Sequence, residues 1–271
     1  MLNKMQELFS KEEFDIIPES FVLPDEATQF LNVFNEGQLN DRVNNHWIIK
    51  PAASSQGKGI YITDSMSEID IDKKSVVCRY ITNPFLINSH KFDLRIYVII
   101  TSIDPLRVYM FKDGLARFAA EKYSSRDIKN RCSHLTNYSI NKKNKNFIHN
   151  KSEEQDDYGY KWSIKALWKN LEIAGIDLDI LWSKIYDAII KTIISAEGKI
   201  YEQVKRYCAH RTNWFEIFGF DVLIDSNLKP WILEVNLSPS LSSDSPIDWK
   251  IKNTLLASTF NLIGLNKFSR K

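Results

Sequence analysis

The sequence predicts an α+β protein with largely antiparallel sheets, divided into a small front lobe and a larger rear lobe. Two observations carry this prediction. Strand-like segments dominate residues 46–111, and two helical segments, a hairpin and a terminal helix follow them. With 271 residues, 44% of them hydrophobic, the chain can bury a substantial core.

The front of the chain is polar over residues 1–45 and is expected to contain short helices. Alternating or continuous apolar runs then predict a series of strands. These strands are expected over residues 46–51, 59–63, 75–81, 91–101 and 105–111.

Residues 121–160 are polar and rich in lysine and asparagine, which predicts a long surface loop. Apolar residues at helical spacing predict helices over Ser163–Ala174 and Leu178–Tyr207. A terminal helix is expected over Pro246–Ile263, with Ser245 or Asp244 as its N-cap.

Composition excludes several classes of protein. Lysine and arginine number 36 against 34 acidic residues, and this balance does not favour a nucleic-acid-binding protein. The three cysteines, Cys78, Cys132 and Cys208, are widely separated, which argues against a disulfide framework or a zinc site. No apolar run approaches the roughly 20 residues of a membrane crossing, and the first residues do not resemble a signal peptide. We therefore expect a cytoplasmic protein.

A β-hairpin is expected near the end of the chain, because apolar runs over 218–224 and 231–235 flank a polar turn. A four-residue loop over 226–229 would pair Asp225 with Pro230. The same register would continue along both strands.

This register places Asp221 opposite Glu234, with Asn236 on the same face. The Cβ atoms of such a pair lie roughly 4.5–5.5 Å apart, so the like charges repel. A divalent cation removes the repulsion, and Mg²⁺ prefers oxygen ligands. Two interpretations follow from the spacing: a magnesium site, or an edge hairpin whose acids face water.

The segment 47–62 joins two strands through a loop of small residues. It is not a Walker P-loop, since Ala52 and Gly59 occupy positions that the motif reserves for glycine and Ser/Thr. Gly57 and Gly59 permit positive φ, so backbone N–H groups can approach phosphates. Lys50 ends a buried-looking strand, where a bound phosphate would satisfy its ammonium. The alternative is a hairpin loop whose lysine reaches solvent.

Lys91, Asp93 and Arg95 alternate along one predicted strand and therefore share a face. A polar row on an otherwise apolar strand indicates the wall of a cleft. Arg117, in the strand GLARF, adds a cation suited to bidentate recognition of carboxylate or phosphate.

Together these segments resemble the tubulin–tyrosine-ligase-like family, whose members are ATP-grasp amino-acid ligases. The similar pieces occur in the family's order from about residue 10 to 264. They are WIIKP, QGKGI, KFDLRIYV, GLARF, HLTNYSIN, KWS and FGFDVLID followed by LKPWILEVNLSPSL. SHLTNYSINKK, KTIISAE and IDWKIK look closest to the branch that attaches glutamate to the γ-carboxylate of a tubulin glutamate. That branch includes polyglutamylases that start side chains.

The resemblance implies an ATP-grasp fold in which two lobes enclose an ATP cleft. Lys50 would contact phosphates, and residues 78–81 would receive the adenine largely through their backbone. The implied ATP-binding residues are Lys50, Gln56, Gly57, Cys78, Arg79, Tyr80, Ile81, Lys91, Phe92, Asp93, Thr136 and Asn137.

The resemblance also implies an amino-acid site and a magnesium site. The residues expected to hold the incoming glutamate are Gln56, Arg117, Tyr138, Ser139 and Lys161. Those expected to bind Mg²⁺ are Asp221, Glu234 and Asn236, in agreement with the hairpin. The residues expected to act in catalysis are Lys50, Arg95, Arg117 and Glu234.

The sequence departs from the family pattern in three places. Cys78 stands where glutamine is usual, and Gln56 stands where the closest branch more often has arginine. The family's N-terminal domain and a linker lysine are expected to be missing. The expected division is a small lobe over 1–83, including an N-terminal helical segment, and a large lobe over 84–271.

The implied function is an ATP-dependent tubulin glutamyl ligase, or polyglutamylase, that works through an acyl phosphate. The alternatives are a glycine or tyrosine ligase of the same family, or a catalytically silent tubulin- or nucleotide-binding remnant. Expected partners are free glutamate and the acidic C-terminal tail of tubulin, with no nucleic acid or membrane. The chain is expected to be monomeric and to act at microtubules, including those of the cilium or basal body. Basic residues within 122–145 would attract the tail or simply form a solvated loop.

Overall fold

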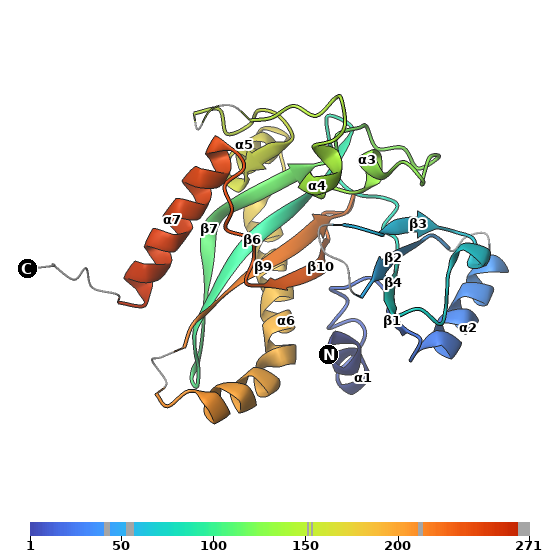
Figure 1. The fold of residues 1–271 in the computed structure, drawn as a ribbon, viewed down its shortest axis with the longest axis horizontal. Helices are drawn as coiled ribbons and strands as arrows, with labels where there is room; N and C mark the ends of the chain where they lie inside the picture. The colour runs from blue at the N-terminus through green and yellow to red at the C-terminus, as the bar shows by residue number, and fades with distance from the viewer. Residues whose placement is uncertain (41–43, 53–56, 151, 153, 211–213, 265–271) are drawn as a thin grey trace, which may run out of the picture.

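Two antiparallel sheets organise the computed structural model, which describes residues 1–40, 44–52, 57–150, 152, 154–210 and 214–264 (Figure 1). One sheet has four strands in the order β1-β4-β2-β3. The other has the order β10-β9-β6-β7-β8, with β5 paired to β6. All the strand pairs are antiparallel, as the predicted α+β class requires.

The four-stranded sheet is covered by helix α2. Phe30 and Phe34 lie four residues apart on one face of α2 and pack with Trp47 in a buried cluster. The rings of Phe30 and Trp47 meet edge to face with centroids 5.1 Å apart. The elements are β1 (Ser20–Leu23), α2 (Ala27–Gln38), β2 (Trp47–Pro51), β3 (Tyr61–Thr63), the 3₁₀ turn η1 (Met66–Glu68) and β4 (Ser75–Arg79).

Strand β1 was not predicted. It is only four residues long, and its pattern alone does not distinguish it from a loop. Its pairing with β4 makes it an edge strand of the sheet.

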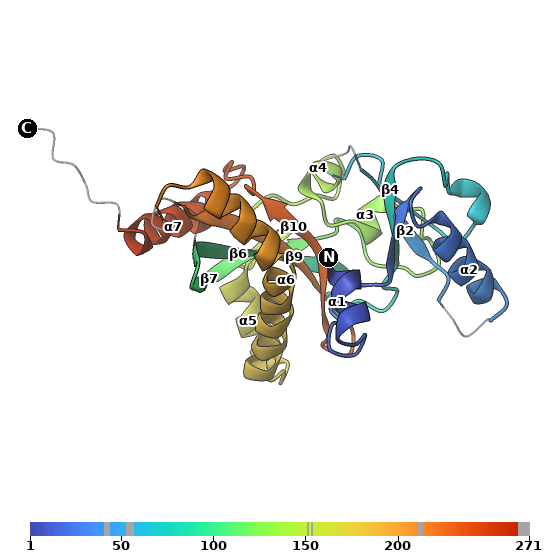
Figure 2. The ribbon, with the colours of Figure 1, turned by 90° about the horizontal axis from the view of Figure 1, so that it is seen from below.

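The six-stranded sheet carries helices on both faces (Figures 1 and 2). Helices α5 and α6 cover one face and α7 covers the other. The strands are β5 (Leu86–Ile87), β6 (His90–Ile103), β7 (Leu106–Phe118), β8 (Lys161–Ser163), β9 (Glu216–Ile224) and β10 (Pro230–Leu237). The helices are α5 (Ile164–Ile173), α6 (Leu178–Tyr207) and α7 (Pro246–Leu262).

Alternation along β6 decides what each face of this sheet does. Leu94 and Ile96 join the core under α5 and α6. Tyr97 and Ile99 point to the opposite face and pack under α7. Lys91, Asp93 and Arg95 share that second face but precede the part that α7 covers, so the same face is polar at one end and apolar at the other.

The predicted helices are confirmed, and side-chain caps explain where they begin. Ser163 caps α5, Asp177 caps α6 and Ser245 caps α7, each by accepting a backbone N–H of the first turn. Of the two residues proposed to cap the terminal helix, Ser245 is therefore the one that does so.

The segment expected as a long surface loop is partly folded, which corrects the prediction. We call residues 119–160, between β7 and β8, the cover segment. It contains two one-turn helices, α3 (Arg131–His134) and α4 (Tyr138–Asn141). The buried side chain of Asn141 accepts from Ala120 N at 2.7 Å and donates to Leu135 O at 2.7 Å. One asparagine amide thus satisfies backbone groups that have no strand or helix partner.

The residues before β1 lie against the six-stranded sheet. Helix α1 (Leu2–Leu8) contacts α6, and Ile16 belongs to the large core. The division at residues 83 and 84 stays a prediction. Within the described residues, no helix combines the length and apolar character that a membrane crossing requires.

Candidate active site

The hairpin of β9 and β10 places Asp221 directly opposite Glu234, as predicted. The register by which it does so differs from the prediction. Pro230 pairs with Ile224 rather than Asp225, and the loop has five residues instead of four. A β-bulge between Ile232 and Glu234 then shifts the pairing by one residue and brings the two acids together.

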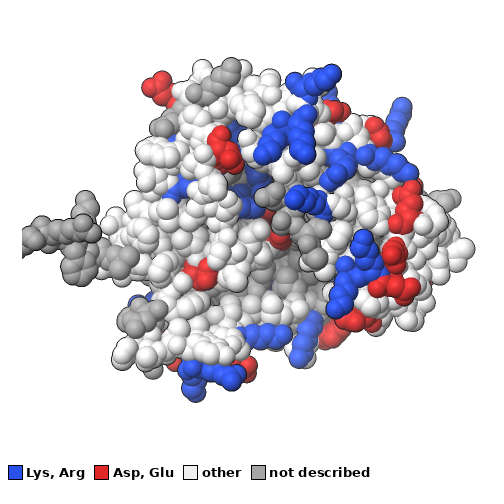
Figure 3. Space-filling view, viewed as in Figure 1, with Lys and Arg blue, Asp and Glu red and all other residues white. Residues whose placement is uncertain are grey.

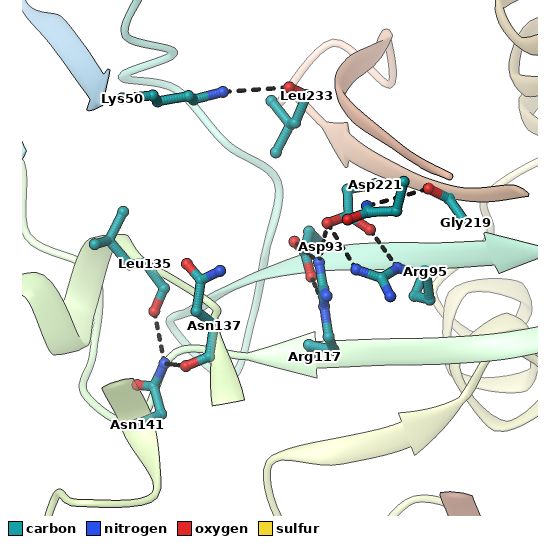
Figure 4. Close-up of polar contacts among 11 residues, drawn as sticks. Lys50, Asp93, Arg95, Arg117, Leu135, Asn137, Asn141, Gly219, Asp221 and Leu233 are labelled. Atoms are coloured by element: carbon teal, nitrogen blue, oxygen red, sulfur yellow. Dashed lines mark hydrogen bonds and ion pairs between the residues drawn. The ribbon is translucent and has the colours of Figure 1, made fainter. Parts of the chain in front are cut away.

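The bulge also gives Lys50 a protein partner. Lys50 Nζ donates to the carbonyl oxygen of Leu233, the bulged residue, at 3.2 Å (Figure 4). This hydrogen bond joins the end of β2 in one sheet to β10 in the other. The ammonium of Lys50, which was predicted to contact a phosphate, is therefore bound to the residue that precedes Glu234 in the chain.

Four charged side chains form one connected cluster on β6, β7 and β9 (Figure 4). Arg95 Nε and Nη2 donate to the two carboxylate oxygens of Asp221 at 2.5 and 3.0 Å. Arg117 donates to both oxygens of Asp93 at 2.8 and 2.5 Å, and its Nη2 lies 2.8 Å from Asp221 Oδ2. The pairs Asp93–Arg117 and Arg95–Asp221 are also direct cross-strand partners. The polar wall predicted from alternation is thus an ion-pair cluster.

Both aspartates of the cluster are buried, and the cluster keeps its charges. Burial by itself would raise the pKa of Asp221, but Arg117 and Arg95 outweigh it and lower that pKa. Burial would lower the pKa of Arg117, but Asp221 and Asp93 raise it well above its usual value. Two guanidinium groups and two carboxylates cancel in formal charge, which makes their burial tolerable.

The donor atoms near Asp221 fit a magnesium ion in their chemistry. Glu234 is exposed, and Asn236 donates its amide Nδ2 to Gly219 O at 3.2 Å, which leaves its amide oxygen as the acceptor. Asp221, Glu234 and Asn236 are all oxygen donors, the type that Mg²⁺ prefers. Among the residues described, no three His, Cys, Asp or Glu side chains cluster as metal ligands, so this set depends on its amide.

Lys91 is buried beside the segment proposed to receive the adenine. Its Nζ donates to the hydroxyl of Tyr80 at 2.9 Å, and that hydroxyl lies 2.7 Å from His134 Nδ1. Burial lowers the pKa of Lys91 to about 7; Asp93 opposes this shift and the charge of Lys50 adds to it. An anion that binds next to Lys91 would raise this pKa again, and Lys91 would then carry a full positive charge at neutral pH.

The other residues proposed for the adenine segment differ in exposure. Cys78 is buried, and Ile81 is half-buried. The side chain of Arg79 is engaged away from the site, since it pairs with Glu19 at 2.7 Å and lies over the ring of Trp47 at 4.4 Å. The backbone N–H of Arg79 also donates to Glu19 O at 2.8 Å, so neither this N–H nor the side chain is free for a nucleotide.

Phe92 does not join the polar face. Its side chain is 1% exposed and packs in the core against Phe85 and Phe118, on the opposite face of β6. Alternation along the strand accounts for this placement, because Lys91 and Asp93 on either side point the other way.

Gly57, which follows β2, lies close to the cover segment. Gly57 has the positive φ expected from the sequence, at 75°. A Cβ built there would lie 2.8 Å from Ile140 Cδ1 and 3.0 Å from Asn137 Cγ, so the contact requires glycine. Arg131 Nη2 donates to the Gly57 carbonyl oxygen at 2.7 Å. Gln56 lies outside the described residues, and Thr136 next to Asn137 is buried.

The residues proposed for the incoming amino acid come together from three elements. Lys161 on β8 pairs directly with Arg117 on β7. The ammonium of Lys161 lies 4.5 Å from the ring centre of Tyr138, at the start of α4, where Ser139 follows. The same ammonium donates to Asp248 Oδ2 at 2.5 Å. Sequence reasoning did not single out Asp248.

Comparison with known proteins shows which family and which curated proteins the chain resembles. A family model described as "Tubulin-tyrosine ligase family" matches residues 1–270. The chain is 45% identical over 263 residues to a human protein named tubulin polyglutamylase TTLL5, covering 96% of this chain and 20% of that protein. It is 44% identical over 265 residues to human tubulin monoglutamylase TTLL4, covering 97% and 22%. It is 42% identical over 273 residues to tubulin polyglutamylase ttll-5 of Caenorhabditis elegans, covering 96% and 37%. The chain therefore spans about a fifth of the length of the two human relatives.

Proposed function

The chain belongs to the tubulin-tyrosine ligase family, and on that premise we propose that it is an ATP-dependent ligase that adds glutamate to a glutamate side chain of tubulin. The observation that carries the proposal is the buried cluster of Asp93, Arg117, Asp221 and Arg95. It lies beside Glu234 and Lys50, where phosphates, a metal ion and a carboxylate substrate would meet. The relatives named as tubulin polyglutamylases and a monoglutamylase support the choice of glutamate and tubulin.

Lys50 and Lys91 are proposed to bind the phosphates of ATP. Both are lysines near the junction of the two sheets, and Lys50 would exchange the Leu233 carbonyl for a phosphate oxygen. Gly57 and Gly59, which follow β2 and have positive φ, would supply backbone N–H groups, and residues 78–81 would receive the adenine. This arrangement would place the γ-phosphoryl group close to the acidic pair of the hairpin, Asp221 and Glu234.

The chemistry that we propose is amide formation through an acyl phosphate. A carboxylate is a poor electrophile, so the acceptor side chain first attacks the γ-phosphorus of ATP, ADP leaves, and an acyl phosphate forms. The neutral amine of the second glutamate then attacks the acyl carbon, phosphate leaves, and the amine nitrogen loses a proton. Positioning and charge stabilisation account for most of the catalysis in such transfers.

The fixed cations would act on the charge that develops during the phosphoryl transfer. Arg95 neutralises Asp221 on one side, and Lys50 faces the same region from the other sheet. Asp221, Glu234 and Asn236 would hold Mg²⁺, which when bound supplies further neutralisation of the phosphate charges.

The incoming glutamate is proposed to be bound through its carboxylates. Arg117 and Lys161 are cross-strand neighbours, so their cations face the same region of the site. Arg117 already binds carboxylates in a bidentate manner, with Asp93 as its partner. Tyr138 and Ser139 at the start of α4 would border the same ligand.

The acidic tail of tubulin is proposed to approach the cover segment between β7 and β8. Figure 3 shows lysine and arginine side chains gathered over the region of α3 and α4. Among the described residues of this segment, the exposed ones are Lys122, Arg126, Lys129, Arg131, Lys142, Lys143 and Lys145. A concentration of positive charge attracts an acidic peptide and weakens with added salt. The activity would accordingly be exerted at microtubules, including those of the cilium.

The proposed function is tested by incubating the protein with ATP, Mg²⁺, tubulin and each of glutamate, glycine and tyrosine, followed by mass spectrometry of the tubulin tails. We expect added mass only with glutamate. Added glycine or tyrosine would assign another ligase activity. Measurable ATP binding with no added mass for any amino acid would identify a silent nucleotide-binding protein instead.

A further inference from the structure

Asp248, a residue of helix α7, binds the ammonium of Lys161. Its Nζ lies 2.5 Å from Asp248 Oδ2 and 4.5 Å from the ring centre of Tyr138. Lys161 and Asp248 are 87 positions apart in the chain, and both are buried. An ammonium has three N–H donors, so Asp248 directs one of them and thereby sets where the other two point.

Asp248 is itself held rigidly. Ser245 Oγ donates to Asp248 Oδ2 at 2.9 Å and also accepts the backbone N–H of Asp248 as the cap of α7. Lys252, one turn later, lies 3.3 Å from Asp248 Oδ1 and donates to the Ser242 carbonyl oxygen. The Asp248 side chain is only 1% exposed.

The buried charges in this group do not cancel. Lys161 and Lys252 contribute two positive charges against the one negative charge of the buried Asp248. The other carboxylate that acts on Lys252, Asp244, is exposed to solvent. The neighbouring cluster of Arg95, Arg117, Asp93 and Asp221 sums to zero. Asp248 is shared by two ammonium groups, so its single charge does not neutralise both, and an anion that binds near Lys161 would be stabilised. Lys161 is the cross-strand neighbour of Arg117, and this places the surplus at the proposed amino-acid site.

We propose that Asp248, supported by Ser245, is a positioning residue that orients Lys161 for a carboxylate of the incoming amino acid. The inference rests on the proposed function and names the residue that sets the affinity for that substrate. Asp248 acts through Lys161, without touching the substrate. A carboxylate between Lys161 and Arg117 then supplies the missing negative charge.

A purely structural tie between α7 and β8 is the competing explanation, and the chain offers a matched control for it. Asp156, just before β8, pairs with Lys250 of α7 at 3.2 Å and accepts from Ser163 Oγ at 3.1 Å. This contact also joins α7 to the β8 region, but its side chains are partly exposed and carry no surplus charge.

The test compares Asp248→Asn with Asp156→Asn and the wild type by steady-state ligation and by calorimetric binding of glutamate in the presence of a non-hydrolysable ATP analogue. Without the Asp248 charge, Lys161 and Lys252 repel each other and Lys161 loses its orientation. We expect a rise in KM for glutamate, and in its dissociation constant, of about tenfold or more. The KM for ATP should change less than about twofold, and Asp156→Asn should behave as wild type. Asp248→Glu, which keeps the charge, should recover part of the affinity.

The inference would be overturned if Asp248→Asn lowers kcat and raises the KM values for glutamate and for ATP by equal factors. It would also be overturned if glutamate binding is unchanged in Asp248→Asn. If Asp248→Asn does not fold, Ser245→Ala is compared with Asp177→Ala instead. Both substitutions remove a helix cap, but only Ser245 contacts Asp248. A rise in KM for glutamate in both cap variants, or in neither, contradicts the proposal. A wild type that binds glutamate but ligates nothing would refute the ligase function while the binding measurements still decide the role of Asp248. A wild type that binds no glutamate overturns both.

Discussion

Arg95 and Asp221 stand directly opposite each other on β6 and β9, and the guanidinium of Arg95 engages both oxygens of the carboxylate, at 2.5 and 3.0 Å. A cross-strand pair therefore coincides with a bidentate ion pair in a nearly buried position. The geometry fixes the orientation of Asp221 before any ligand arrives.

Loss of this pair should impair both stability and activity. In Arg95→Gln, Asp221 keeps only Arg117, and we expect the free energy of unfolding to fall by about 1.5–3 kcal/mol. Activity should fall by about a hundredfold or more, because Asp221 loses the group that orients it. Urea denaturation and ligation assays measure the two effects. Arg107→Gln, at an exposed position of β7, is the control and should change neither.

Glu234→Gln should abolish ligation and leave the fold intact. Glu234 is exposed, so the substitution should change the free energy of unfolding by no more than about 0.5 kcal/mol. The lost charge removes one of the two carboxylates proposed to bind Mg²⁺. Ligation rates over a range of Mg²⁺ concentrations measure the effect. The control is Glu216→Gln, at the first residue of β9. An active Glu234→Gln enzyme with an unchanged Mg²⁺ requirement would refute the metal assignment.

ATP binding should be accompanied by proton uptake near pH 8. The pKa of Lys91 is lowered to about 7 chiefly by burial, so much of its population is neutral at that pH in the free protein. A bound phosphate raises this pKa again, and ATP affinity should therefore decrease as the pH rises above about 7. Calorimetry in buffers of different ionisation enthalpy measures the uptake. Lys91→Met should remove it, whereas Lys112→Met, at an exposed position of β7, should not.

The cluster should also make stability sensitive to acid. In the folded state the pKa of Asp221 lies below the ordinary value of an aspartate, because Arg117 and Arg95 outweigh the effect of burial. A carboxylate of lowered pKa stabilises the fold above its unfolded pKa, and this contribution is lost as the pH falls through the folded pKa. We expect the free energy of unfolding to decline below about pH 4. The decline should be shallower in Asp221→Asn, and parallel curves for the two proteins would contradict the assignment.

Charge reversal of Lys142, Lys143 and Lys145 should weaken binding of an acidic tubulin-tail peptide, because the three exposed side chains belong to the basic cover segment. The wild-type affinity should decrease as salt shortens the screening length to about 10 Å at 0.1 M. Fluorescence anisotropy at several salt concentrations measures both effects. Reversal of the exposed Lys169, Lys199 and Lys205 on α5 and α6 is the control. Equal affinities in the two triple variants would refute the proposed tail surface.

The sequence by itself determined most of the longer elements and much of the polar face, but not β1, α3 or α4. Helix α6 runs over Leu178–Tyr207, as its apolar spacing predicted, and Lys91, Asp93 and Arg95 share one face of β6 because a strand has a period of two. These features follow from local periodicity and capping, which a linear sequence displays.

Tertiary structure decided which charges meet. Neither the bulge that brings Asp221 opposite Glu234 nor the bond from Lys50 to Leu233, 183 positions away, leaves a periodic signal in the sequence. The pairing of Lys161 with Asp248 likewise depends on α7 packing over the sheet. A buried charge needs a partner that the folded packing brings next to it, and local sequence patterns do not encode which distant residue that partner is.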